Sequence, residues 1–172
     1  MFNKRFYCLC LLMLMIALAL SGCASPPVDE PSDAADYNVK LFFVNEEAVT
    51  IGDGSLEPLM PAEEMTLSST PGGIQLATIE ALKIVPSKES YGTMVSDTLK
   101  INAVYTEDGT AYVDLSRENL SGSSTQETLL ISQIVKTLRE SFPEILRVQF
   151  LVDGQVVESL MGHMAADKPF TE

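Results

Sequence analysis

The N-terminal end of this 172-residue chain determines where its folded part can begin. Lys4 and Arg5 precede an apolar run from Phe6 to Leu20, and the run closes with Leu20-Ser21-Gly22-Cys23. A positive segment, an apolar segment and a small residue before a cut are typical of an export signal, and a cysteine directly after the cut is typical of a bacterial lipobox. We therefore expect residues 1–22 to be removed as a lipoprotein signal peptide.

Cleavage between Gly22 and Cys23 makes the cysteine the first mature residue and the lipidation site. Its thiol is expected to carry a diacylglyceryl group and its amine an acyl chain such as palmitate, and several chains anchor stably where one binds reversibly. The alternative, an uncleaved transmembrane helix, has an apolar stretch at the short end of the roughly 17 to 25 residues that span a bilayer. Pro26 and Pro27 also end any helix just beyond it. The sequence thus predicts a lipid anchor on the extracytoplasmic face of the bacterial cell membrane.

Loss of the signal peptide changes the composition of the mature chain. It removes Cys8 and Cys10, and lipidation uses Cys23, so we expect no disulfide, no thiol nucleophile and no cysteine metal ligand. It also removes Lys4 and Arg5, which leaves 9 basic against 24 acidic residues. Phosphate backbones are bound by clustered Lys and Arg, whereas these basic residues are scattered in the sequence, so nucleic acid is not expected as a partner.

Residues 23–36 are predicted to form a tether. Between Ala24 and Asp36 lie three prolines, four acidic residues and a single large apolar side chain. Such a segment cannot bury enough apolar surface to order itself, and its charges repel one another. We expect the folded part to span residues 37–172, which is enough for one compact domain and too short for two of ordinary size.

In the first half of this domain the patterns predict one strand and one helix. The β-branched and aromatic run 39–44 predicts a strand, bounded by polar residues, and residues 51–55 have the composition of a turn. Residues 65–68 are expected to form a short edge strand. A first helix is expected to start at Thr70-Pro71 and to end before Pro86, with a polar loop after it.

The second half has stronger signals. Alternation in residues 99–106 and 111–115, joined through Asp108-Gly109, predicts a β-hairpin. Ser124 and Glu127 have the spacing of a capping box and are expected to open a second helix that ends at Pro143. The apolar residues of this helix share one stripe, which is expected to face a sheet: Ile131, Ile134, Val135, Leu138 and Phe142.

A last strand, 148–152, is expected to turn at Asp153-Gly154 into a second hairpin with residues 155–158. The order is then strand, helix, hairpin, helix, hairpin. This order predicts an α+β two-layer sandwich, in which a small mixed or antiparallel sheet carries two helices on one face.

Four segments of the second half share their order and spacing with a known domain family: Val113-Asp114-Leu115-Ser116, the run from Gln133 to Phe142-Pro143-Glu144-Ile145, the run from Val148 to Gly154, and Leu160-Met161-Gly162-His163 with Pro169-Phe170. On these motifs the chain resembles the GerMN domain of sporulation and spore-germination lipoproteins, over about residues 38 to 170. The resemblance implies a fold similar to the ring-building modules of envelope complexes. It also implies a role in sporulation, germination or envelope assembly, and it supplies no catalytic residue and no cofactor.

The sporulation protein of this family carries two tandem domains. This chain is expected to carry one, because residues 38–110 repeat neither the Val-Asp-Leu-Ser motif nor the Phe-Pro-Glu-Ile motif.

The residues give no sign of an assembled catalytic site. His163 is the only histidine and has no cysteine or second histidine to help it, so a hydrogen-bonded structural role is expected. The adjacent pairs Glu46-Glu47 and Glu63-Glu64 would point to opposite sides of an extended chain. Asp114 and Ser116 are expected to accept hydrogen bonds from free backbone N–H groups at a strand end. We therefore expect no enzyme, no metal and no cofactor.

Two functions remain open at this point. The first is a membrane-anchored interaction or scaffold domain whose partners are envelope proteins or a second copy of the chain. The alternative is an envelope protein that binds a small ligand or Ca²⁺, for which Asp53-Gly54-Ser55 and Glu107-Asp108-Gly109 place oxygens near glycine turns. Neither segment has the alternating acidic ligands of a calcium loop, so solvated turns are expected there.

Overall fold

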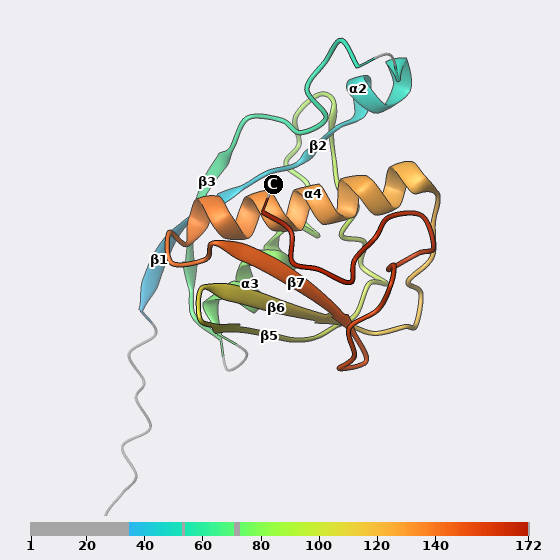
Figure 1. Ribbon diagram of the computed structural model, residues 1–172. Helices are drawn as coiled ribbons and strands as arrows, with labels where there is room; N and C mark the ends of the chain where they lie inside the picture. The colour runs from blue at the N-terminus through green and yellow to red at the C-terminus, as the bar shows by residue number, and fades with distance from the viewer. Residues whose placement is uncertain (1–34, 53, 71–72, 172) are drawn as a thin grey trace, which may run out of the picture. The chain divides into compact units, whose positions relative to one another are not determined.

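The computed structural model describes residues 35–52, 54–70 and 73–171 (Figure 1). The predicted signal peptide and Cys23, with nearly all of the predicted tether, lie outside these ranges. Within them, no helix is long and apolar enough to cross a membrane.

The central sheet has three strands in the order β5 (Ile101–Glu107), β6 (Thr110–Leu115) and β7 (Arg147–Val152). The predicted hairpin is confirmed, because β5 and β6 are antiparallel and join through Asp108 and Gly109, whose φ angles are 48° and 71°. Positive φ at both positions is what a two-residue hairpin turn requires. Strand β7 runs parallel to β6, from Thr110 opposite Arg147 to Leu115 opposite Val152.

A parallel neighbour cannot be reached by a tight turn, and here the crossover is helix α4 (Ser124–Ser141). All five members of the predicted apolar stripe of this helix are buried. Helix α4 packs against α3 (Ile74–Ala81) and β7, and α3 also contacts β5 (Figure 1). The core between helices and sheet includes the fully buried Val113 and Phe150. The predicted α+β architecture with two helices on one sheet face is thus confirmed.

The second predicted hairpin is wrong beyond its turn. Asp153 and Gly154 do turn the chain, with φ angles of 49° and 77°. After them, however, residues 155–158 form only a single bridge, between Val152 and Gln155. The far edge of β7 is instead covered by the C-terminal segment, where Val148 and Phe170 exchange two backbone hydrogen bonds of 2.9 and 2.8 Å.

The first helix is shorter than predicted. It begins after Gly73, whose φ of 88° is not helical, and ends at Ala81. From Leu82 to Ile84 the backbone N–H groups bond to carbonyls three residues back, which tightens the chain into a turn before Pro86. Thr70 does not cap the helix, since its hydroxyl donates to the Gly73 carbonyl.

Two small antiparallel ribbons complete the domain. Strand β1 (Asp36–Leu41) pairs with β3 (Glu63–Ser68), which confirms the edge strand and extends it by two residues. The predicted strand 39–44 is divided, because β2 (Val44–Asn45) pairs with β4 (Tyr91–Gly92) and not with β3.

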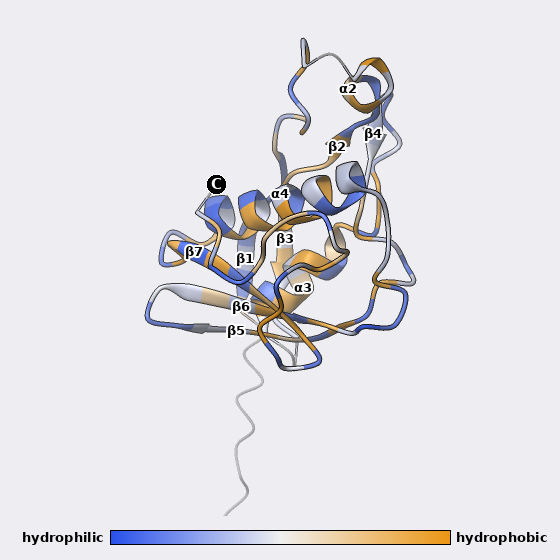
Figure 2. Cartoon of the chain, turned by 45° about the vertical axis from the view of Figure 1, so that its right-hand side comes forward, coloured by the Kyte–Doolittle hydropathy of each residue, from blue (hydrophilic) through white to orange (hydrophobic). Residues whose placement is uncertain are grey.

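Helix α2 (Glu46–Ile51) was not predicted. The Asn45 side chain accepts hydrogen bonds from the N–H groups of Glu47 and Ala48, and Gly52 ends the helix in the left-handed conformation at φ 67°. None of its residues is buried, and it projects beyond the rest of the domain (Figures 1 and 2).

Candidate interaction surface

Helix α4 holds several other segments of the chain through its polar side chains. Glu127, on the first turn of this helix, is fully buried. Its Oε1 accepts from the Ser159 hydroxyl at 2.7 Å and from the backbone N–H groups of Leu160 and Met161 at 2.9 Å each. Its Oε2 accepts from the N–H groups of His163 and Met164 at 2.8 and 3.2 Å. One carboxylate therefore holds the backbone of the loop 159–164.

Because Glu127 binds the loop 159–164, it does not form the predicted capping box with Ser124. The box is formed one residue earlier, because the Ser123 hydroxyl accepts from the Gln126 N–H at 3.3 Å and the Gln126 side chain accepts from the Ser123 N–H at 2.8 Å. The Glu127 side chain takes no part in the cap and points into the domain. Burial raises the pKa of Glu127, but the hydrogen bonds from Met161, Ser159, His163 and Leu160 outweigh it and leave the pKa below its ordinary value. The carboxylate is thus a charged acceptor in the fold at neutral pH.

Further along α4, Gln133 and Thr137 hold two more segments. Gln133 is fully buried; its Oε1 accepts from the Met94 N–H at 2.9 Å and its Nε2 donates to the Thr93 hydroxyl at 3.1 Å. Thr137 Oγ1 accepts from the Phe42 N–H at 3.2 Å.

Ser141, one turn after Thr137, accepts from the Lys40 N–H at 2.9 Å and donates to the Lys40 carbonyl at 3.1 Å. The four residues from Thr137 to Ser141 rise about 6 Å along the helix, and alternate strand residues are about 6.6 Å apart. The two hydroxyls therefore match the spacing of Lys40 and Phe42 and continue the hydrogen bonding along the edge of β1 to the residue after its end.

The other singled-out motif residues also bind backbone. Asp114 Oδ1 accepts from the Gly154 N–H at 2.8 Å, and the Ser116 hydroxyl accepts from the Glu118 N–H at 3.2 Å, as predicted. The exposed His163 ring places Nε2 3.1 Å from the Gly122 carbonyl. These contacts explain the motifs as supports of the fold.

The paired carboxylates do not converge on a site. Glu46 and Glu47 lie in the first turn of α2. Glu63 binds the Lys88 ammonium through both oxygens, at 2.6 and 2.7 Å, and accepts from the Tyr91 hydroxyl at 2.8 Å. The hydrogen bond with Lys88, and then that with Tyr91, lower the pKa of Glu63.

Of the two candidate calcium segments, Glu107-Asp108-Gly109 forms the β5–β6 turn, and Asp53 of the other lies outside the described residues. In the described part of the chain, no group of three or more His, Cys, Asp or Glu could hold a metal ion.

Residues 46–52 and 54–58, which we call the knob, expose apolar side chains. Val49, Ile51 and Leu56 are 40%, 48% and 37% exposed. The knob comprises α2 and the chain that returns from it to Leu59, and its described residues include three acidic residues, Glu46, Glu47 and Glu57, and no basic residue. Val49 and Ile51 lie on the projecting helix α2, and Leu56 lies on the returning chain. Exposed apolar side chains that form one patch are typical of a protein interaction site.

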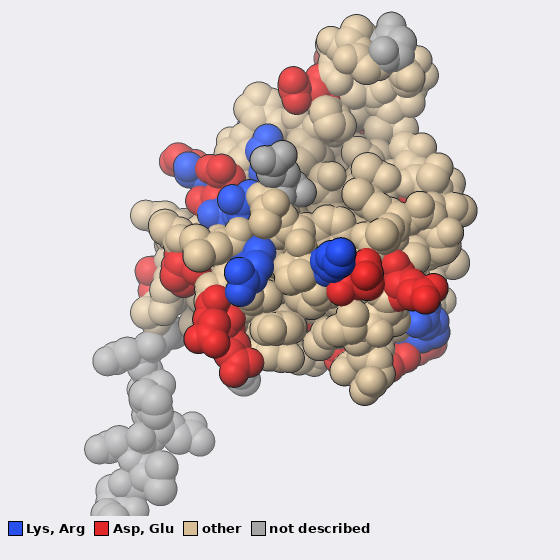
Figure 3. All heavy atoms as spheres, viewed as in Figure 1, with Lys and Arg blue, Asp and Glu red and all other residues tan. Residues whose placement is uncertain are grey.

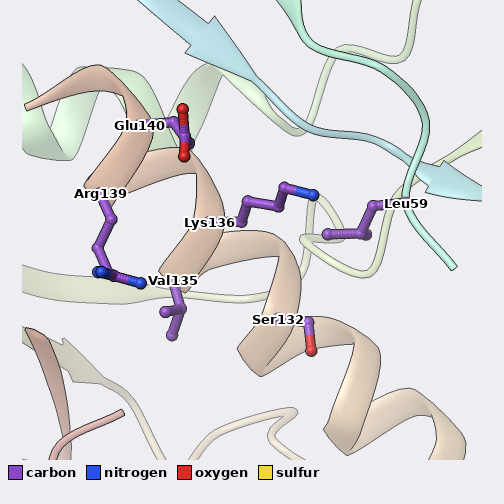
Figure 4. Close-up of a pocket in the computed structure, with 6 residues that line it drawn as sticks. All are labelled: Leu59, Ser132, Val135, Lys136, Arg139 and Glu140. Atoms are coloured by element: carbon purple, nitrogen blue, oxygen red, sulfur yellow. The ribbon is translucent and has the colours of Figure 1, made fainter. Parts of the chain in front are cut away.

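A hollow of about 290 Å³ lies on α4, next to the base of the knob. Leu59 and Val135 give it an apolar side, and Ser132, Lys136, Arg139 and Glu140 complete its lining (Figure 4). The Lys136 ammonium lies 4.9 Å from the centre of the Phe42 ring, and an Arg139 Nη1 donates to the Thr171 carbonyl. We call this site the hollow. Over this part of α4, Lys and Arg side chains lie with acidic side chains among them (Figure 3).

Sequence reasoning missed the knob, the hollow and the role of Glu127. The caps of α2, Asn45 and Gly52, were visible in the sequence and could have indicated a short helix. The partners of Glu127 are 32 to 37 residues further along the chain, so no local pattern could have identified them.

One family model matches most of this chain. The family model named Germane, described as sporulation and spore germination, matches residues 40–158. A candidate lipoprotein of Clostridium perfringens has a similar structure, with a TM-score of 0.53 and 26% identity over 80% of this chain and 89% of that one. No curated protein matches the sequence significantly.

Two structures of the Bacillus subtilis sporulation protein GerM share the fold. Its tandem GerMN domains give a TM-score of 0.56 at 18% identity, over 80% of this chain and 46% of that one. Its first GerMN domain gives 0.51 at 15% identity, over 78% of this chain and 98% of that one. This chain thus spans about half of the tandem protein and corresponds in fold to a single domain.

Proposed function

Because the chain belongs to the Germane family of sporulation and spore germination proteins, we propose that it is a lipid-anchored extracytoplasmic lipoprotein whose GerMN domain is a non-catalytic interaction module. Its partners are envelope proteins of a sporulation, germination or cell-envelope complex. The lipid is attached at Cys23, and the domain works at the outer face of the cell membrane.

The observation that carries this proposal is the knob. A six-residue helix with no buried residue gives nothing to the core, yet it exposes Val49 and Ile51 to water. Exposing apolar side chains costs free energy unless a partner covers them. Glu127 and Gln133 are the buried polar side chains of α4 that could be candidates for catalysis. Both bind backbone N–H groups instead.

The similarity to a candidate lipoprotein of Clostridium perfringens supports the anchor. A lipid anchor confines the domain to a thin layer at the membrane and raises its effective concentration towards other membrane-held proteins. A small interaction surface such as the knob then suffices.

Replacing the lipid acceptor tests the anchor. Cys23→Ser should abolish incorporation of a fatty-acid analogue during metabolic labelling and should release the protein from the detergent phase. Labelling that persists in Cys23→Ser would contradict the lipobox interpretation.

Replacing the domain tests the interaction module. In a deletion strain, the anchored native domain should restore the wild-type phenotype, whereas an unrelated fold behind the same signal and tether should not. The proposal fails if the unrelated fold restores the phenotype equally well.

A further inference from the structure

The knob and the hollow have complementary chemistry. The knob presents an apolar tip, formed by Val49, Ile51 and Leu56, among acidic residues. The floor of the hollow includes Leu59, which is 8% exposed, and the fully buried Val135, and basic groups lie beside them. An apolar tip with acidic flanks can fill such a hollow without burying an unpaired charge.

The charges of the hollow stand out against those of the whole chain, which has a formal net charge of −13. Lys136 and Arg139 line it, and the neighbouring Lys40 has its ammonium 3.7 Å from Glu140, the one acidic residue in the lining. Lys40 is thus paired, as Lys83 and Lys88 are with Glu80 and Glu63, whereas Lys136 and Arg139 form no ion pair within the described residues. The basic side chains at the hollow therefore attract the acidic residues of a knob.

We propose that the hollow binds the knob of a second copy of this chain, an inference that rests on the proposed interaction function. Leu59 ends the chain that returns from the knob and also lines the hollow, so the two surfaces are neighbours on one side of the domain. Neighbouring complementary surfaces suit a two-fold arrangement, in which each copy inserts its knob into the hollow of the other.

The contact is small, because a hollow of about 290 Å³ holds only a few side chains. Exposed charge pairs also contribute little each. The dimer is therefore weak in solution and forms where the anchor holds copies close together. For this reason the test uses the full-length chain in its membrane.

The decisive experiment reverses charges on each surface in turn. Two differently tagged full-length copies are expressed together, carry a photo-cross-linking amino acid in place of Ile51, and are irradiated in cells. Wild-type copies should form a cross-linked dimer whose second site maps to residues 132–140. Glu47→Lys with Glu57→Lys in both copies, or Lys136→Glu in both, should each reduce the dimer about fivefold.

A mixed pair should recover it. In the mixed pair, the basic knob of the Glu47→Lys, Glu57→Lys copy meets the less basic hollow of the Lys136→Glu copy. The acidic knob of the Lys136→Glu copy meets the unchanged basic hollow of the other copy. Both contacts are more favourable than those between two copies of the same variant. Lys100→Glu, an exposed reversal away from both surfaces, is the matched control and should leave the dimer unchanged.

The inference is overturned if the mixed pair cross-links no better than the single variants, or if Lys100→Glu is equally harmful. It is also overturned if position 51 cross-links only to a different protein, an outcome that leaves the proposed interaction function standing. Absence of any cross-linked protein, together with full rescue of the deletion strain by the knob variants, would overturn both.

Discussion

Helices α4 and α2 show two opposite ways of being stable in one domain. Helix α4 buries an apolar stripe, and its inward polar side chains bind the backbone of three other segments. Helix α2 buries nothing and is held by its own caps, Asn45 and Gly52. The buried side chains of α4 are therefore needed by the fold, whereas the exposed side chains of α2 can contact a partner.

The largest expected effect comes from the stripe of α4. Leu138 is fully buried, and truncating such a leucine costs about 2 to 5 kcal/mol through lost transfer energy and a cavity. Leu138→Ala should therefore lower the free energy of unfolding, measured by chemical denaturation, by that amount. Glu140→Ala on the exposed face should change it by less than about 1 kcal/mol, because it loses only an exposed ion pair with Lys40. Equal effects would mean that α4 does not hold the core.

The next largest effect is expected at Glu127. Glu127→Gln keeps the shape but replaces one acceptor oxygen by a donor, which faces backbone N–H groups of the loop 159–164. Loss of hydrogen bonds to a charged group costs about 1.5 to 3 kcal/mol each. Denaturation should show a loss of at least this size, and hydrogen exchange should show faster exchange at Leu160 and His163. A variant as stable as the wild type would contradict the buried anchor.

The same carboxylate predicts a pH dependence. Because the folded state lowers the pKa of Glu127, its stabilising effect is fully present above the unfolded value of about 4.3 and is lost as the pH falls through the lowered folded value. The difference in unfolding free energy between wild type and Glu127→Gln should therefore shrink as the pH is lowered from 7 into this acidic range. A difference that stays constant would mean that the charge of Glu127 plays no part.

A smaller effect is expected from the two hydroxyls on the edge of β1. Thr137→Val leaves the buried Phe42 N–H without its acceptor and should cost about 1 to 3 kcal/mol. Ser141→Ala, at the exposed Lys40, should cost less, because water can replace the hydroxyl. Thermal denaturation of both variants checks the order. A larger loss of stability in Ser141→Ala than in Thr137→Val would show that the hydrogen bond from Phe42 to Thr137 contributes little.

The elements predicted well are those whose information is local. The stripe of α4 follows from its helical period, and the β5–β6 turn follows from Asp108-Gly109, which adopts the positive φ angles that the turn needs. The parallel partner of β7 was missed because pairing with β6 joins residues 37 apart, such as Thr110 and Arg147.

Two further errors have a physical origin. The register of β5 shifts between Ile101 and Ala103, so Val104 faces the core while Tyr105 is exposed, against the simple alternation of the sequence. The candidate site was missed because exposure of an apolar side chain is a property of the whole fold. The turn composition of residues 51–55 does not by itself show that the Ile51 side chain is exposed.

The most direct test of the account is a single charge placed on the knob. Ile51→Asp should leave the free energy of unfolding within about 0.5 kcal/mol of the wild type, since the side chain is half exposed and packs into no core. It should nevertheless fail to restore a deletion strain. The matched control is Ile84→Asp, at a position 77% exposed and outside the knob, which should keep both stability and function. An Ile51→Asp protein that restores the wild-type phenotype, or one that fails because it unfolds, would contradict the division between a helix that holds the fold and a helix that meets the partner.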